Sequence, residues 1–153
     1  MAETDSIVPE FHGDFTYGID QSRRLMVPAR WRPKDSNVLF TMILWPIAVE
    51  DCLLVMPPEP WKAMMTKLKT QATGDEGLAA LERVLGSTSV KVTLDKVGRL
   101  CLPENLTATA GISDKAQLLG RIDKFELWNP DKRTGVSQQD KALAAQFAKQ
   151  IGL

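Results

Sequence analysis

A nine-residue stretch, Asp20-Gln21-Ser22-Arg23-Arg24-Leu25-Met26-Val27-Pro28, returns 75 residues later as Asp95-Lys96-Val97-Gly98-Arg99-Leu100-Cys101-Leu102-Pro103. Both copies follow the pattern D-x-x-x-R-L-x-(V/L)-P, and each is preceded by residues that favour β-strands, at 15–19 and 90–94. The pattern predicts a strand, a polar turn, a second short strand, and then a proline that starts a helix. The chain therefore carries one structural unit twice.

The surrounding sequence extends the repeat, because residues 51–58 align in order with residues 123–130. We expect strands near 38–44, 51–56, 117–122 and 125–128, with a bend around residues 45–46. Helices are expected from about Pro60, from Glu76 to Leu85 with Gly86 as the cap, and from Pro103 to about Ala110. Ser137 is expected to cap a C-terminal helix whose Leu143, Phe147 and Ile151 are spaced four apart. This apolar stripe predicts contact with a partner surface.

The composition argues against a polycation that coats nucleic acid, because 19 Lys and Arg balance 19 Asp and Glu. The cations gather between Asp20 and Lys34, so a basic face remains possible on a neutral protein. The two cysteines, Cys52 and Cys101, each lie in an apolar run and are expected to be buried, reduced thiols.

Residue types needed for several kinds of chemistry are missing from the sequence. His12 is the only histidine, so one chain holds neither a histidine-based triad nor a histidine metal cluster. No glycine-rich phosphate loop occurs. We therefore expect no enzyme activity, no catalytic residue, no metal, no cofactor and no small-molecule substrate.

The first ten residues are acidic and lack the features of a signal peptide, which predicts a disordered cytoplasmic tail. The longest apolar run, at 38–49, is interrupted and is too short to span a bilayer. We expect a soluble protein that does not bind membranes.

The duplicated turns present arginine, whose planar guanidinium matches guanine O6 and N7 or phosphate oxygens through paired hydrogen bonds. The Asp of each turn can accept backbone N–H groups or orient the Arg four residues later. A single D-x-x-x-R turn is more often a solvated turn than a DNA-reading element. Two identical turns related by pseudo-symmetry favour joint contact with a duplex.

The two D-x-x-x-R-L-x-(V/L)-P copies, Phe11-His12-Gly13 before the first, and Lys124-Phe125-Glu126-Leu127-Trp128 after the second make this sequence resemble the MraZ family. The resemblance covers about residues 11–130. It differs from the family pattern at Arg23, where the family has glycine, at His12, where it has arginine, at Pro33, which shortens the first helix, and in the acidic N-terminal extension.

The resemblance implies an α+β fold of two pseudo-symmetric AbrB-like swapped-hairpin halves, forming a double-split β-barrel with flanking helices. We expect a tail at 1–10 and a single domain at 11–153. That domain would comprise repeats at about 11–86 and 87–136 and a C-terminal helix at 137–151.

For function, the resemblance implies a transcriptional regulator of the division and cell-wall gene cluster, expected to be a repressor. It would be cytoplasmic and nucleoid-associated, would assemble into an octamer-like homo-oligomeric ring, and would bind short G-rich direct repeats in double-stranded DNA. Arg24 and Arg99 would read bases. Arg23 and Lys96 are candidate phosphate contacts, and Asp20, Asp95 and Gly98 would support the turns.

A protein-interaction module, such as an AbrB-type antitoxin that neutralises a different chain, is the alternative from another functional class. The expected helices at 60–85 and 137–151 favour self-assembly over a disordered segment that wraps a partner.

Overall fold

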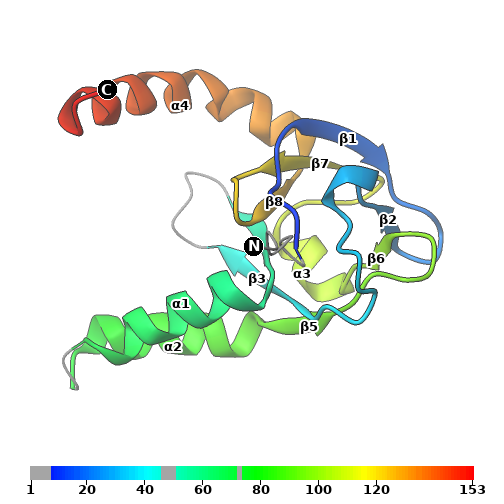
Figure 1. Ribbon diagram of the computed structural model, residues 1–153, viewed down its shortest axis with the longest axis horizontal. Helices are drawn as coiled ribbons and strands as arrows, with labels where there is room; N and C mark the ends of the chain where they lie inside the picture. Colours follow the sequence, from blue (N-terminus) through cyan, green and yellow to red (C-terminus); the bar gives the residue numbers. More distant parts are fainter. Residues whose placement is uncertain (1–7, 46–50, 72–73) are drawn as a thin grey trace, which may run out of the picture.

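The computed structural model describes residues 8–45, 51–71 and 74–153. Most of the predicted N-terminal tail and the residues after Trp45 in the predicted bend lie outside these ranges. Val8 is described, and it packs against the main core. Figure 1 shows a body of strands from which helices α1 and α2 project together and helix α4 projects separately.

The elements occur in a similar order in two successive parts of the chain. The first half contains β1 (Asp14–Gly18), β2 (Arg24–Met26), the 3₁₀ helix η1 (Ala29–Trp31), β3 (Phe40–Trp45) and β4 (Cys52–Met56). Helices α1 (Pro58–Lys69) and α2 (Glu76–Thr88) come next. The second half contains β5 (Val90–Val92), β6 (Arg99–Cys101), α3 (Glu104–Thr109), β7 (Lys115–Gly120) and β8 (Phe125–Trp128), and α4 (Pro130–Gln150) ends the fold. The α+β prediction is confirmed.

The main sheet interleaves the two halves. Its strand order is β1-β7-β8-β4-β3-β5, so the order reads the same under exchange of the halves. The first strand of each half pairs antiparallel with the third strand of the other: β1 with β7, and β5 with β3. Strands β4 and β8 pair at the centre. Neither half can therefore complete the sheet alone.

A second, two-stranded sheet lies on the pseudo-two-fold axis. Its strands β2 and β6 pair antiparallel, with Leu25 opposite Leu100 at the centre. Arg24 lies opposite Cys101 and Met26 lies opposite Arg99, so the two ends of this short ladder are equivalent. Both central leucines are fully buried, which fixes the register by directing the flanking residues away from the core.

The main core is aromatic. Phe11, Trp31, Phe40 and Phe125 contact one another with ring centroids 5.0–6.4 Å apart, and they pack with the two central leucines. A second cluster joins the opposite face of the sheet to α1 and α2. All five residues of β4 are consequently buried, because both faces of this strand are covered.

Three local predictions are wrong. Helix α2 continues past Gly86 to Thr88, since Gly86 does not adopt the left-handed conformation that a glycine cap would need. Helix α4 begins at Pro130 rather than at Ser137, because Asn129 caps it by accepting a hydrogen bond from the Asp131 N–H at 2.9 Å. Cys101 is exposed, since Leu100 takes the inward position in β6.

In the ranges that the structure covers, no helix combines the length and apolar character required to cross a membrane.

Candidate functional site

The Asp of the first turn holds that turn together. Its backbone N–H donates to the Arg24 carbonyl at 3.1 Å, and its carbonyl accepts from the Arg23 N–H at 3.0 Å. Its side-chain oxygen Oδ1 accepts from the N–H groups of Ser22 and Arg24, both at 2.9 Å. The short carboxylate of Asp20 therefore accepts two backbone N–H groups of its own turn, which is one of the two roles expected for it.

The second turn repeats these four hydrogen bonds. The Asp95 N–H donates to the Arg99 carbonyl at 2.9 Å, and the Asp95 carbonyl accepts from the Gly98 N–H at 3.0 Å. Asp95 Oδ1 accepts from the N–H groups of Val97 and Arg99 at 3.0 and 2.9 Å. The same turn geometry therefore occurs at both ends of the β2–β6 ladder.

The residue before each Arg adopts positive φ, which is 64° at Arg23 and 89° at Gly98. Glycine takes this conformation freely, whereas a residue with a Cβ atom pays about 1–2 kcal/mol. The first turn therefore keeps the shape of the second, and Arg23 bears the backbone strain.

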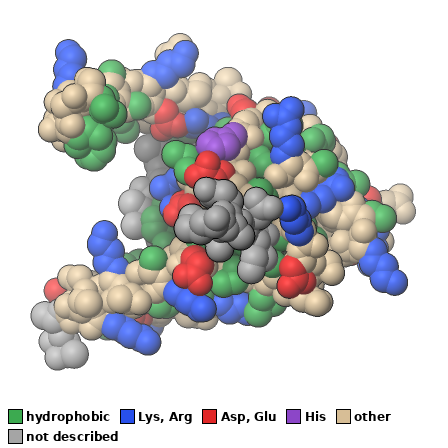
Figure 2. Space-filling view, in the orientation of Figure 1, with side chains coloured by type: hydrophobic (Ala, Val, Ile, Leu, Met, Phe, Trp, Pro, Cys, Tyr) green, Lys and Arg blue, Asp and Glu red, His purple; other side chains and the backbone are tan. Residues whose placement is uncertain are grey.

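The two turns form one surface rather than two separate tips. Arg99 pairs with Asp95 of its own turn, Nε to Oδ2 at 2.8 Å, and with Asp20 of the other turn, Nη1 to Oδ2 at 3.5 Å. Arg24 reaches Asp95 across the axis at 4.0 Å. We call these four residues the central cluster. Figure 1 shows the turns side by side, and Figure 2 shows Lys and Arg side chains along that side of the molecule.

The central cluster combines restrained guanidinium groups with accessible ones. The Arg24 side chain is 45% exposed and that of Arg99 is 30% exposed. Burial alone would raise the pKa of Asp95, but hydrogen bonds from the backbone and side chain of Arg99 and from the Val97 N–H outweigh it. The pKa of Asp95 is therefore lower than usual, and the carboxylate remains ionised to orient both arginines.

Arg23 and Lys96 have different surroundings. The Arg23 guanidinium turns inward, where Nη1 donates to the Ser113 carbonyl at 2.9 Å and Nη2 donates to Thr107 Oγ1 at 2.6 Å. Lys96 is exposed at the apex of the second turn. A phosphate contact is open to Lys96 as it stands, whereas Arg23 would first have to give up these two hydrogen bonds.

Arg32 was not predicted as a site residue, yet it lies directly against the second turn. Its Nε donates to the Val27 carbonyl at 3.0 Å. A Cβ atom added to Gly98 would lie 2.2 Å from that nitrogen. The 75-residue offset places Arg32 in register with Thr107, which is the partner of Arg23 in the first turn. Applying the repeat to residues outside the turns could therefore have identified both side chains.

Within the described ranges, no group of three or more His, Cys, Asp or Glu residues is placed to hold a metal ion. His12 lies at the surface, with its Nε2 3.0 Å from Glu10 Oε1.

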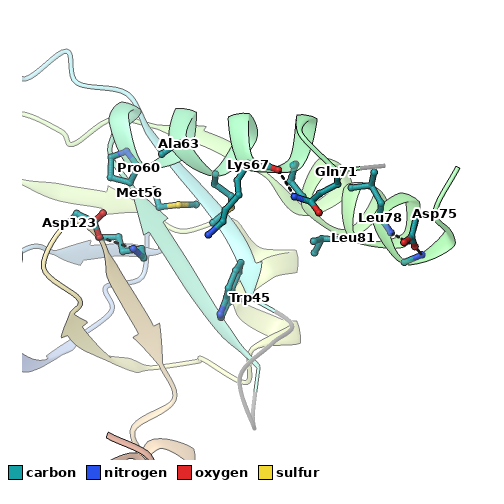
Figure 3. A pocket seen from close by; sticks show the side chains of 14 residues that line it. Trp45, Met56, Pro60, Ala63, Lys67, Gln71, Asp75, Leu78, Leu81 and Asp123 are labelled. Carbon is teal, nitrogen blue, oxygen red and sulfur yellow. Dashed lines mark hydrogen bonds and ion pairs between the residues drawn. The ribbon is translucent and has the colours of Figure 1, made fainter. Parts of the chain in front are cut away.

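An apolar groove lies away from the turns. Its volume is about 710 Å³, and it lies between α1, α2, the end of β3 and the turn that joins β7 to β8. Figure 3 shows Trp45, Met56 and Ala63 along its wall, with the Lys67 side chain extending from α1 into the space between Met56 and Trp45 and with Asp123 at one end. The groove is large enough to take apolar side chains of a docked segment.

The last turns of α4 and its C-cap residue, Ile151, carry exposed apolar side chains. Leu143 and Phe147 are each 59% exposed, and Ile151 is 55% exposed. Their spacing of four residues places them on one side of the helix. Figure 2 shows hydrophobic side chains gathered on this part of α4. The predicted stripe thus exists, and most of its surface contacts nothing in the described chain.

The duplicated turns and interleaved sheet define a two-repeat α+β protein with an arginine-bearing surface on its pseudo-two-fold axis. The sequence model of a family described as "MraZ protein, putative antitoxin-like" matches residues 86–152. A protein of Pseudomonas fluorescens (strain Pf0-1) named transcriptional regulator MraZ is 34% identical over 137 residues, covering 89% of this chain and 91% of the relative. A protein of that name from Roseiflexus sp. (strain RS-1) is 30% identical, covering 92% and 96%. The chain belongs to the MraZ family.

Proposed function

We propose that this chain is a sequence-specific DNA-binding transcriptional regulator and that the central cluster contacts the DNA. The observation that carries the proposal is the pairing of two equivalent turns through Asp20–Arg99 and Arg24–Asp95. The names of the relatives support a regulatory role. Repression of division and cell-wall genes, a cytoplasmic, nucleoid-associated location and the absence of enzyme activity belong to the same proposal.

The short β2–β6 ladder suits the major groove, which admits a two-stranded β-ribbon. Arg24 and Arg99 would each donate two hydrogen bonds to guanine O6 and N7, which makes G-rich sites the favoured targets. Asp20 and Asp95 restrain these side chains before DNA arrives, so less conformational entropy is lost on binding. Lys96 would contact phosphate and add affinity without selectivity.

We propose further that the interleaved strands correspond to the swapped-hairpin, double-split barrel of AbrB-like proteins. The pairings of β1 with β7 and of β5 with β3 support this proposal, because each half supplies a strand to the other.

A neutral chain with one small contact surface needs several copies for tight binding, because linked sites raise the effective concentration at neighbouring repeats. We propose that the α4 stripe of one copy enters the α1–α2 groove of the next. Helix α4 has 21 residues and therefore extends about 30 Å, far enough to reach a neighbour. Such a head-to-tail contact closes into a ring when its rotation permits, in keeping with the expected octamer-like assembly on direct repeats.

DNA recognition is tested by selecting bound fragments from random DNA and measuring fluorescence anisotropy on the selected site at several salt concentrations. Arg24→Ala and Arg99→Ala should each weaken the free energy of DNA binding by about 1–3 kcal/mol and relax selectivity at one base. Lys96→Ala should weaken binding to all DNA sequences alike and should reduce the salt dependence of the affinity. Arg83→Ala, on the exposed side of α2, removes the same charge elsewhere and should change little.

Thermal melts establish that each variant is folded. The mechanism is wrong if the Arg24→Ala, Arg99→Ala double variant is folded and assembled yet binds the selected site with unchanged affinity.

Assembly is tested by light scattering on two variants that each remove one side of the contact. Phe147→Asp should damage the stripe, and Ala63→Glu should damage the groove. Each variant alone should be monomeric. A mixture should form dimers, because the intact stripe of one variant can enter the intact groove of the other. Ala145→Asp, also exposed on α4 but about half a turn away from the stripe, is the matched control. A ring that persists in Phe147→Asp would exclude this contact.

The groove also supports a second candidate function, in which it holds a different chain, as an antitoxin-like interaction module would. Such a module would co-purify with another protein and would select no DNA sequence. The anisotropy and purification experiments separate the two functions.

A further inference from the structure

Each turn is supported by one contact with the other half of the chain, and the internal repeat relates these two contacts. In one contact the arginine belongs to the turn, and in the other it belongs to the opposite half. Shifting Arg23 and Arg32 by 75 residues gives Gly98 and Thr107. In the folded chain Arg23 contacts Thr107, and Gly98 lies against Arg32. Each contact therefore joins the turn of one half to the fourth residue after the helix-starting proline of the other half, Pro28 or Pro103. Each contact contains one arginine and one small residue.

In the first contact the arginine comes from the turn. Arg23 extends across the axis to Thr107 Oγ1 and to the Ser113 carbonyl, at 2.6 and 2.9 Å. Thr107 is 1% exposed, and its hydroxyl oxygen also lies within 3.1 Å of the carbonyls of Pro103 and Glu104. The guanidinium thereby connects the first turn to α3 and to the segment between α3 and β7.

In the second contact the arginine comes from the other side. Arg32 donates from Nε to the Val27 carbonyl at 3.0 Å, and its Nη2 lies 3.1 Å from Met26 Sδ. Its side chain covers Gly98 so closely that a Cβ atom there would lie 2.2–2.6 Å from three Arg32 atoms. The absence of a side chain at position 98 makes this approach possible.

We propose that one guanidinium braces each turn, that Arg23 and Arg32 are these two positioning residues, and that the arginine can be supplied from either side of the contact. This proposal rests on the proposed function insofar as the turns present Arg24 and Arg99 to DNA. It also explains the residue types at these positions. Position 98 is glycine because Arg32 of the opposite segment occupies the space of a side chain there. Position 23 is a strained arginine because the opposite segment carries Thr107, which supplies no guanidinium.

The test moves the arginine of the first contact to the opposite side of that contact. In Arg23→Gly the first turn keeps its backbone shape but loses its guanidinium, and adding Thr107→Arg returns one from the other side. Amide hydrogen exchange is measured at Ser22 and Arg24, whose N–H groups bond Asp20 Oδ1. Exchange at these amides should accelerate on the order of tenfold in the single variant and recover in the double variant. The equivalent amides of the second turn, Val97 and Arg99, should not change.

Gly98→Arg with Arg32→Thr is the reciprocal pair, and it keeps the test decisive if Arg23→Gly does not fold. Gly98→Arg alone should loosen the second turn, and the pair should restore it. Uniform acceleration of exchange across the chain, or no recovery in either double variant, would overturn the brace. The DNA affinity of the Arg23 variants is measured separately by fluorescence anisotropy. Loosened turns with unchanged DNA affinity would leave the brace standing and would instead refute DNA reading through Arg24.

Discussion

Gly98→Ala tests the packing of Arg32 against the second turn without reference to DNA. The substitution places a Cβ atom 2.2 Å from Arg32 Nε in a backbone with φ of 89°. A Cβ atom at positive φ costs about 1–2 kcal/mol. Moving Arg32 aside also breaks its hydrogen bond to the Val27 carbonyl, and a hydrogen bond from a charged donor is worth about 1.5–3 kcal/mol. We expect the free energy of unfolding to fall by about 2.5–5 kcal/mol.

The chain provides a matched control for the strain alone. Gly74 has a φ of 88°, and a Cβ atom there meets nothing within 4 Å. Gly74→Ala should therefore cost only about 1–2 kcal/mol. Urea unfolding of both variants, each also made in an Arg32→Ala background, gives the coupling between positions 98 and 32. In that background Gly98→Ala should cost no more than Gly74→Ala.

The reasoning fails if Gly98→Ala and Gly74→Ala cost the same in the wild-type background. Equal costs would mean that Arg32 moves away from Gly98 without loss and that the close approach carries no energy.

Three further predictions use other features of the structure. The lowered pKa of Asp95 means that its contribution to stability is present above the unfolded-state pKa and is lost as the pH falls through the folded-state pKa. The stability difference between wild type and Asp95→Asn, measured by urea unfolding, should therefore be largest near neutral pH and should shrink in acid. Iodoacetamide should modify exposed Cys101 and spare Cys52, since burial raises the pKa of the Cys52 thiol far above its ordinary value. Mass spectrometry checks this selectivity, and because Cys101 pairs with Arg24 across the ladder, modification should also weaken DNA binding. Finally, a fragment of residues 88–130 should show no cooperative thermal unfolding as a monomer, because β5 and β7 would lose their partners β3 and β1.

Local patterns were sufficient to place most elements and both turns. The D-x-x-x-R turn is predictable because the Asp carboxylate bonds N–H groups within four residues of itself. Helix ends were less predictable: Gly86 lies inside α2, since the chain passes directly into β5, and the cap of α4 is Asn129. The outward direction of Cys101 depends on the inward direction of Leu100, which the apolar run around it does not reveal.

The internal repeat, the α+β class and the identity of the turn residues follow from the order of residues, because each depends on interactions within a few positions along the chain. The folded structure was needed to show that Asp20 lies beside Arg99, that Arg23 turns inward to Thr107, and that Arg32 covers Gly98. These contacts join residues 66–84 positions apart in the sequence, and they exist only because each half supplies a strand to the sheet of the other. Local propensity does not encode that exchange of strands, because the exchange places residues of both halves, Leu25 and Leu100 among them, in one shared buried core.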